Sequence, residues 1–421
     1  MPTVKFFTLG CKVNQYETQV MREKFIGSGF KELSDSQPAD IYVINTCTVT
    51  QTADSKSRYL IHYAHRENHQ AKIIVTGCYT ELDSHKIEKI PGVTRIIKNE
   101  DKQKILELSN ENNDIGEPNE IGISNFSRHT RAFLKVQDGC NNSCAYCKVP
   151  LVRGGSRSRP VLEIIDEAEK LAKNGFGEIV LCGICLGAYG KDLPEKIDLV
   201  DVIERLENIE GLLRIRLSSL EAGDISDRLI HKMAGSQKLC PHLHIPIQSG
   251  DDKILNKMQR SYTREYYSAL INKIKKHIPQ IALTTDVLVG FPEEDEENFQ
   301  NTLNLIQEIL PLKVHIFPYS PRKDTPAFNL QDKVSPTIIK QRIFQLKAIA
   351  KECALIYRKQ FLNQDMEVLL EDNSRENPCL WCGFTSNYIK VVVESSQNLK
   401  NKPIPLKLKK ISRDSLWAEF C

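Results

Sequence analysis

The sequence predicts an α/β protein built from an N-terminal parallel sheet, a central partial (β/α)6 barrel and a C-terminal small β-barrel. Short apolar runs alternate with helix-like stretches in the first hundred residues and again from residue 128, as in parallel sheets with crossover helices. The last segment instead contains short strand-like runs separated by turn residues. We therefore expect domains at 1–107, 128–358 and 359–421. A linker rich in Asn, Glu, Gly, Ser and Pro is expected at 108–127.

Composition restricts the possible functions. The net charge of +3 is small for 421 residues, so any nucleic-acid surface must be a local patch. The sequence has no secretory pattern at its start and no apolar run of about 18 residues, so we expect a soluble cytoplasmic protein without a membrane partner. In that setting, the 13 cysteines indicate metal binding or catalysis rather than disulfides.

In the N-terminal part, three apolar runs each end close to a cysteine, in the segments VKFFTLGC, DIYVINTC and KIIVTGC. Helix-like stretches at 15–26 and 53–67 separate the runs. Because ligands of such sheets bind outside the carboxyl ends of the strands, Cys11, Cys47 and Cys78 should converge at one edge. A single cysteine there is usually a small buried apolar residue. Three in successive strands favour a three-cysteine cluster site.

In the central part, six candidate strands alternate with helical stretches at 162–173, 199–207, 264–276 and 294–309. The strands are expected at 133–136, 179–181, 215–217, 243–247, 283–289 and 314–317. Barrel enzymes place their sites on the loops at the carboxyl ends of the strands. The loop after the first strand carries Cys140, Cys144 and Cys147.

These three cysteines suit a four-iron cluster, because thiolates are its usual ligands and a trio leaves one iron open. An open iron can bind S-adenosylmethionine, whose reductive cleavage yields a carbon radical. A structural zinc site is the alternative, with a distant fourth ligand such as His129 or Cys182. Tyr146, directly before the third cysteine, favours the radical chemistry.

Other polar residues follow the predicted barrel strands. Glu221 comes after the third strand and could pair with a ligand, although a surface glutamate is the ordinary interpretation. Gln248 ends the fourth strand. After the cysteine loop, four basic side chains could contact phosphate or a cofactor carboxylate, or remain solvated: Lys148, Arg153, Arg157 and Arg159.

The C-terminal part begins with a predicted amphipathic helix at 336–358, followed by strand-like runs at 367–370, 388–393 and 406–408. Residues 400–414 carry six positive charges and one negative charge. Such a patch could follow a phosphate backbone, or it could be a solvated hairpin. The sequence assigns no role to five further cysteines: Cys182, Cys185, Cys379, Cys382 and Cys421.

Several of these motifs resemble known families. Cys-x3-Cys-x-Tyr-Cys resembles the signature of the radical S-adenosylmethionine superfamily. The segments TLGCKVNQYETQ, NTCTVT and TGCY resemble the N-terminal domain of methylthiotransferases, and the last segment resembles their RNA-binding TRAM domain. The resemblance implies two [4Fe–4S] clusters, an auxiliary one on Cys11, Cys47 and Cys78 and a catalytic one on Cys140, Cys144 and Cys147. It also implies that Tyr146, Glu221 and Gln248 contact S-adenosylmethionine.

The run KVNQYE most resembles the branch that acts on N6-threonylcarbamoyladenosine in tRNA. The resemblance therefore implies transfer of a methylthio group to C2 of that nucleoside at position 37, in the anticodon stem-loop. Two alternatives within the family are isopentenyladenosine tRNA and a ribosomal protein. A non-catalytic zinc-containing RNA-binding protein is the alternative of another class. The sequence identifies neither the electron donor nor the sulfur donor.

Overall fold

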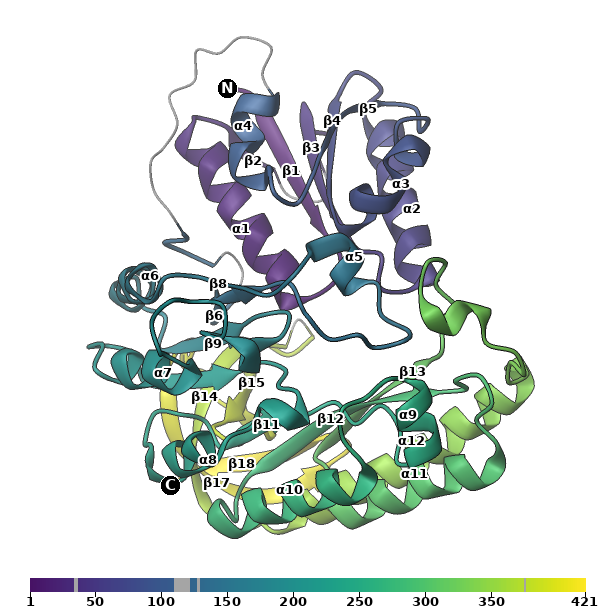
Figure 1. Cartoon of the computed structure of the whole chain (residues 1–421). Helices are drawn as coiled ribbons and strands as arrows, with labels where there is room; N and C mark the ends of the chain where they lie inside the picture. The colour runs from purple at the N-terminus through teal and green to yellow at the C-terminus, as the bar shows by residue number, and fades with distance from the viewer. Residues whose placement is uncertain (34–36, 110–121, 127–128, 375) are drawn as a thin grey trace.

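A computed structural model describes residues 1–33, 37–109, 122–126, 129–374 and 376–421. Most of the predicted linker, residues 110–121 and 127, lies outside the described residues. Figure 1 shows the N-terminal sheet and its helices above a curved central layer of strands, with the C-terminal strands on the opposite side of that layer. The α/β class and the order of the three parts agree with the sequence prediction.

The N-terminal sheet has five parallel strands in the order β2-β1-β3-β4-β5. The strands are β1 (Thr3–Thr8), β2 (Lys31–Glu32), β3 (Ile41–Thr46), β4 (Lys72–Gly77) and β5 (Val93–Ile97). The helices are α1 (Lys12–Gly27), α2 (Gln51–Glu67), α3 (Cys78–Ile87), η1 (Lys102–Lys104) and α4 (Ile105–Ser109). The apolar runs predicted β1, β3 and β4. The short β2 and the half-exposed β5 were missed because neither is a buried apolar run.

The central part contains all six predicted strands, arranged as two parallel sheets, β10-β9-β6 and β11-β12-β13. Isolated parallel bridges between Ile215 and Leu239 and between Ser219 and His244 connect the two sheets into one partial barrel. The strands are β6 (Arg131–Lys135), β9 (Glu178–Cys182), β10 (Arg214–Leu217), β11 (His242–His244), β12 (Ala282–Val289) and β13 (Lys313–Pro318). β11 ends earlier than predicted, because Pro246 has no N–H to donate to a neighbouring strand.

Helices cover the outer face of the partial barrel (Figure 1). They are α6 (Val161–Lys173), α7 (Leu199–Glu207), α8 (Asp227–Gly235), α9 (Asp252–Lys257), α10 (Arg264–His277), α11 (Glu296–Ile309) and α12 (Pro336–Lys359). Shorter elements in this part are β7 (Gln137–Asp138), α5 (Val149–Arg153), β8 (Arg157–Ser158), η2 (Leu186–Ala188), η3 (Ala222–Asp224) and η4 (Pro326–Asn329). The antiparallel pair β7–β8 brackets the cysteine loop. None of the helices in the described ranges has the length and apolar character needed to cross a bilayer.

The C-terminal strands close into a small barrel in the order β14-β15-β16-β18-β17. They are β14 (Asp365–Asn373), β15 (Leu380–Thr385), β16 (Lys390–Glu394), β17 (Pro403–Ser412) and β18 (Ser415–Phe420). The sequence predicted three of them and missed β15 and β18, whose apolar positions are interrupted by Gly, Thr, Glu and Ser.

This small barrel docks against the residues that begin the central strands. Arg131 at the start of β6 lies 2.7 Å from Glu371, and Arg214 at the start of β10 lies 2.8 Å from Glu367. Arg216 donates a hydrogen bond to the Ser386 carbonyl and stacks on the Tyr388 ring. The opposite, carboxyl ends of the central strands are the ends at which barrel enzymes place their active sites, and these ends face the N-terminal domain.

Candidate active site

The N-terminal cysteine trio lies at the carboxyl ends of three adjacent strands, as predicted. Cys11 follows β1 and caps α1, Cys47 follows β3, and Cys78 begins α3 after β4. Their thiols are close enough to interact electrostatically with one another. Strand order thus brings together three residues that are 36 and 31 positions apart in the sequence.

Two glycines allow this approach. Gly10 has a φ of +98°, and a Cβ there would lie 3.0 Å from the Cys47 sulfur. Gly77 has a φ of +99°, and a Cβ there would lie 2.4 Å from the Thr46 carbonyl oxygen. Asn14 then ties the strand ends together, because its amide donates to the carbonyls of Leu9 and Thr46. Only glycine tolerates both the backbone conformation and the contact.

The second trio lies in the loop between β7 and α5. Cys140 donates its N–H to the Gly154 carbonyl, and the N–H of Cys147 bonds to the carbonyl of Cys144. Backbone N–H groups of Asn142 and Val149 point to the sulfurs of Cys140 and Cys147, each at 3.4 Å. Hydrogen bonds to sulfur tune the potential of iron–sulfur clusters, so this loop is suited to hold one.

Arg260 is the central side chain beside this second trio. It donates a hydrogen bond of 3.1 Å to the Cys144 sulfur, pairs with Glu221, and lies 3.4 Å from the Tyr146 hydroxyl oxygen. The structure therefore brings Tyr146 and Glu221 to the cysteine loop, where the sequence predicted them. Sequence reasoning missed Arg260, which lies in the unremarkable segment MQRSYT. Only its spatial position, with a buried side chain beside the cysteine loop, distinguishes it from the other arginines.

Gln248 lies beyond β11 with a φ of +68°, a conformation that is uncommon for a residue with a side chain. Its N–H donates to the Asp286 carbonyl, and its carbonyl accepts from the N–H of Leu288, both at 2.9 Å. Leu288 packs in the same small apolar cluster as Tyr146. Gln248 is therefore held at the carboxyl edge of the barrel, on the side of the cysteine loop.

One loop touches both cysteine trios. Cys182, the last residue of β9, is fully buried and interacts electrostatically with Cys11. Three residues later, Cys185 forms a thiol hydrogen bond with Cys140, which lowers the pKa of Cys140 to about 7. The auxiliary and radical-loop trios therefore face the same side of the barrel, separated by this loop.

Burial has the opposite effect on other thiols. It raises the pKa of Cys47 to about 11 and the pKa of Cys147 to about 12. These thiols are neutral without a metal, and ligation of iron has to displace their protons.

The number of thiols in each trio suits an iron–sulfur cluster with one open iron. In a tetrahedral zinc site with bonds of 2.3 Å, sulfurs lie about 3.8 Å apart. Across the described ranges, neither trio has its three sulfurs within 4.8 Å of one another. Each sulfur of a four-iron cluster binds a different iron, which requires a wider spacing. Neither trio is thus as close as a tetrahedral zinc site requires, and each offers the three thiolate donors that a [4Fe–4S] cluster with one open iron would use.

A buried ion network joins the two trios. Glu17 on α1 accepts from Arg153 on α5, from Lys135 on β6 and from Lys102, at distances of 2.5–3.0 Å. Arg153 also lies 3.0 Å from Asp138 and donates to the Asn14 side chain. Burial opposes the charge of Glu17, but Lys102, Lys135 and Arg153 hold its pKa well below the usual value.

This network corrects the interpretation of the basic cluster after the cysteine loop. Arg153 is buried in the network, and Arg159 pairs with the buried Glu167 at 2.7 Å. Lys148 is also buried, 4.0 Å from Asp324. An RNA contact or a solvated charge requires an exposed side chain. Of these four residues, Arg157 alone is exposed. The other three charges support the fold around the loop.

Comparison with known proteins places the chain in known families. Residues 3–98 match the family described as uncharacterized protein family UPF0004, and residues 134–306 match the radical SAM superfamily. Among solved structures, the chain resembles a radical S-adenosylmethionine methyltransferase, TsrM, from Kitasatospora setae with cobalamin and a [4Fe–4S] cluster bound. The TM-score is 0.54 at 13% identity, covering 78% of this chain and 77% of that one. The cobalamin-dependent enzyme OxsB gives 0.53 at 13% identity over 83% and 56%. These likenesses concern the fold alone.

Sequence relatives are closer. The threonylcarbamoyladenosine tRNA methylthiotransferase MtaB of Bacillus subtilis is 40% identical, covering 97% of this chain and 94% of the relative. MtaB of Thermotoga maritima is 36% identical over 88% and 87%. A tRNA-2-methylthio-N(6)-dimethylallyladenosine synthase of Desulfitobacterium hafniense is 32% identical over 97% and 95%.

The fold and the cysteine loop define a radical S-adenosylmethionine enzyme, a class that uses S-adenosylmethionine and [4Fe–4S] clusters. The full-length match is more specific. The chain belongs to the methylthiotransferase family, together with the threonylcarbamoyladenosine tRNA methylthiotransferases.

Proposed function

We propose that this protein transfers a methylthio group to C2 of N6-threonylcarbamoyladenosine at position 37 of tRNA by radical S-adenosylmethionine chemistry. The observation that carries the proposal is the 40% identity over 97% of the chain to a threonylcarbamoyladenosine tRNA methylthiotransferase. The two cysteine trios on one side of the barrel support the same activity, because the reaction needs both a radical source and a sulfur source.

In this proposal, Cys140, Cys144 and Cys147 hold the catalytic cluster, and Cys11, Cys47 and Cys78 hold the auxiliary cluster. With S-adenosylmethionine bound, these groups supply a carbon-centred radical and a methylated sulfur. Tyr146, Glu221 and Gln248 contact S-adenosylmethionine. Arg260 positions Glu221 and donates to the Cys144 sulfur, which stabilises negative charge on that thiolate.

The chain itself must aim the reacting groups and exclude water. A methylthio group can join C2 only if the radical source and the sulfur can each reach that carbon within contact distance. The buried network of Glu17 with Arg153 and Lys135 fixes the N-terminal domain against the barrel. Adenine C2 is inaccessible in a stacked helix, so an unstacked nucleotide of the anticodon loop is the expected substrate.

We also propose the domain limits 1–107, 128–358 and 359–421, with a linker at 108–127, and an RNA-binding role for the last domain. β17 of that domain presents Lys409 and Lys410 to solvent, as backbone contacts to RNA require. An enzyme acting on tRNA is expected to work in the cytoplasm. Its electron and sulfur donors are separate partners that these residues do not specify.

The test is mass spectrometry of tRNA nucleosides from strains with and without the gene. Deletion should remove only the methylthio group from 2-methylthio-N6-threonylcarbamoyladenosine, and a plasmid copy should restore it. Unchanged nucleosides would refute the proposal. A plasmid encoding Cys144→Ala should fail to restore the group, because that variant lacks a ligand of the catalytic cluster.

A second candidate substrate is isopentenyladenosine tRNA, favoured by the 32% identity to a dimethylallyladenosine synthase. Purified enzyme incubated with stem-loops carrying either nucleoside separates the two. Methylthiolation of the isopentenyl stem-loop alone would reassign the substrate. A ribosomal-protein substrate would leave both stem-loops unmodified, and a non-catalytic zinc protein would be colourless and contain zinc instead of iron.

A further inference from the structure

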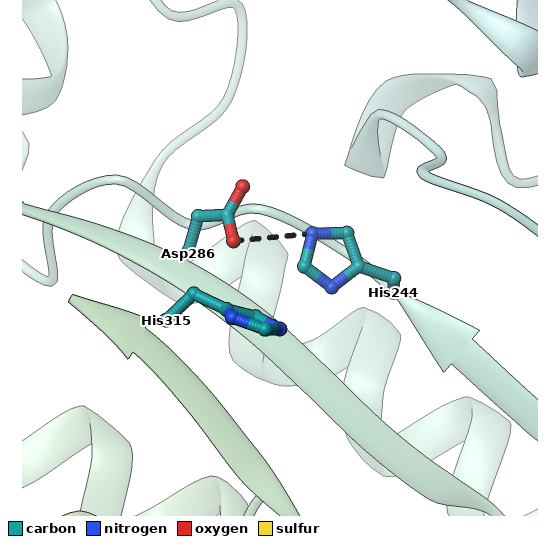
Figure 2. Close-up of side chains that lie close together, drawn as sticks. All are labelled: His244, Asp286 and His315. Carbon is teal, nitrogen blue, oxygen red and sulfur yellow. Dashed lines mark ion pairs between the residues drawn. The ribbon is translucent and has the colours of Figure 1, made fainter. Parts of the chain in front are cut away.

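Three polar side chains meet on adjacent strands of the central barrel: His244 on β11, Asp286 on β12 and His315 on β13. A ligand atom of each lies within 4.8 Å of the others. Figure 2 shows the His244 ring directed at the Asp286 carboxylate, with the His315 ring beside them. His244 Nε2 lies 3.2 Å from Asp286 Oδ1, and the two histidine rings are 5.6 Å apart at 69°.

The trio lies on the inner face of the partial barrel. Side chains alternate along β12, and Leu283, Val287 and Val289 pack in the core that includes residues of the outer helices. Asp286 therefore points the other way, as does Leu288, which contacts the cluster containing Tyr146. Asp286 lies two residues before Leu288 on β12, so the trio lies about one side-chain layer below the cysteine loop.

A hydrogen-bond chain orients the trio. Thr284 Oγ1 lies 2.9 Å from His244 Nδ1 and 3.1 Å from His242 Nε2. A hydroxyl has one proton and two lone pairs, so Thr284 donates to at most one of the two rings and accepts from the remaining one or from both. This contact fixes the His244 ring, so that its second nitrogen faces Asp286. The trio is only partly buried, so a bound group could reach it.

The N-terminal domain adds a positive charge. Lys12, next to Cys11, is exposed, and its ammonium lies close enough to act on both His315 and His242. Burial, Lys313 and Lys12 together lower the pKa of His315, against the opposing effect of Asp286. His315 is therefore a neutral donor at physiological pH, Asp286 is an acceptor, and Lys12 supplies the cation.

We propose that His244, Asp286, His315 and Lys12 form the subsite that recognises the N6 substituent of the modified adenosine. This inference rests on the proposed function and specifies how the substrate is read. A threonylcarbamoyl group offers urea N–H and hydroxyl donors to Asp286, and a carboxylate to Lys12 and His315. No other feature of an adenosine nucleoside combines donors with a carboxylate in this way.

The same subsite discriminates against an isopentenyl group. An apolar substituent would cover the Asp286 carboxylate and the Lys12 ammonium from water without offering a partner to the second Asp286 oxygen or to the ammonium. Sites that hydrogen-bond a polar substrate group reject analogues lacking it by about 10⁴–10⁵-fold when the site is fully closed. Side chains on three barrel strands and on α1 would then determine whether this protein accepts a threonylcarbamoyl or an isopentenyl substituent.

A divalent cation is the competing occupant, because two histidines and a carboxylate can also bind metal. The structure favours the substrate: His244 Nε2, the nitrogen available for a metal, already faces Asp286 Oδ1 at hydrogen-bond distance. Metal analysis of the reconstituted enzyme separates the two. A stoichiometric non-iron metal that disappears in His315→Ala would overturn the proposal.

The decisive measurement is the affinity of the reconstituted enzyme for two anticodon stem-loops, one with N6-threonylcarbamoyladenosine and one with unmodified adenosine. For the parent enzyme, we expect tighter binding of the modified stem-loop. His315→Ala and Asp286→Asn should each lower that affinity about tenfold to a hundredfold, and leave the affinity for the unmodified stem-loop unchanged. His231→Ala, on the exposed face of α8, is the matched control and should change neither.

The two proposals fail separately. If the parent enzyme methylthiolates neither stem-loop, the proposed function is wrong. If it methylthiolates the threonylcarbamoyl stem-loop but both variants keep the parent ratio of affinities, the subsite is wrong. Iron content measured in each variant excludes a loss of clusters as the cause.

Discussion

Glu17 and Arg153 form a two-pronged ion pair at the buried contact between the N-terminal domain and the barrel. Arg153 Nη1 lies 2.8 Å from Glu17 Oε1, and Nη2 lies 3.0 Å from Oε2. Glu17 is six residues after Cys11, and Arg153 is six residues after Cys147. One ion pair thus links the segments that carry the two cysteine trios.

Arg153→Met should destabilise the protein by about 3 kcal/mol, because it removes one partner of a buried charge. Denaturant unfolding of the purified variant measures this loss. Arg157→Met is the matched control, since Arg157 is exposed and, within the described residues, its side chain donates to the backbone carbonyls of Gly155 and Arg153. Its effect should be below about 0.5 kcal/mol. Equal destabilisation by both would contradict a structural role of the ion pair.

The stability should also depend on pH through Glu17. Its pKa is lower in the folded chain than in the unfolded chain, so the unfolded state binds more protons between the two values. The stabilisation is complete above the unfolded pKa of about 4.3 and is lost as the pH falls below it. In urea unfolding, the advantage of the parent over Glu17→Gln should shrink as the pH is lowered from about 6 to below 4. A constant difference would argue against a charged Glu17.

Loss of one ligand should remove one cluster. The parent enzyme, purified without oxygen, should contain about eight irons, and Cys144→Ala and Cys47→Ala about four each. Cys144→Ala should also lose 5′-deoxyadenosine formation, while Cys47→Ala should keep it and lose only methylthiolation. Formation of 5′-deoxyadenosine at the parent rate by Cys144→Ala would show that this loop does not hold the catalytic cluster.

Replacing Cys185 tests whether the fourth iron of the catalytic cluster is left without a cysteine ligand. Its sulfur lies against Cys140, so it could in principle act as a fourth ligand. We expect Cys185→Ala to keep about eight irons and to cleave S-adenosylmethionine, because three cysteines suffice. A drop to about four irons would instead make Cys185 a ligand. Cys379→Ala, in the small C-terminal barrel, is the control for iron lost during purification and should keep about eight irons.

The basic strand β17 should contribute to tRNA binding through phosphate contacts. Replacing the exposed Lys409 and Lys410 with Gln should weaken binding to all tRNAs alike and lower the salt dependence by about one unit per lost contact. Filter binding at several salt concentrations measures both effects. Lys173→Gln, on the exposed end of α6, is the control. Unchanged affinity in the double variant would assign RNA binding to another surface.

Much of the fold was predictable because its signals are local. The apolar runs ending in Cys11, Cys47 and Cys78 each lie within one strand and the turn after it, and the structure confirms β1, β3 and β4. The six central strands were recognised in the same way. β2, β5, β15 and β18 were missed, because their residues pack on neighbours that the chain pattern does not reveal.

The three cysteines of the C-terminal part illustrate the limit of prediction from sequence. Cys379, Cys382 and Cys421 could be considered together from the sequence, but β14 separates their neighbourhoods. Cys421 interacts with Asp365 at the start of β14, and Cys382 with Asp372 near its end. Seven residues of extended strand span about 23 Å. Cys421 therefore cannot join the other two at one metal ion.

The sequence by itself determined the two cysteine trios, the alternation of strands and helices and the resemblance to methylthiotransferases, because these depend on residues close together in the chain. The tertiary structure decided which side chains surround the trios. Arg260 beside Cys144, Arg153 against Glu17 and His315 beside Asp286 are pairs of residues 29 to 136 positions apart. Such contacts depend on strand order and on domain docking, which arise only when the whole chain packs.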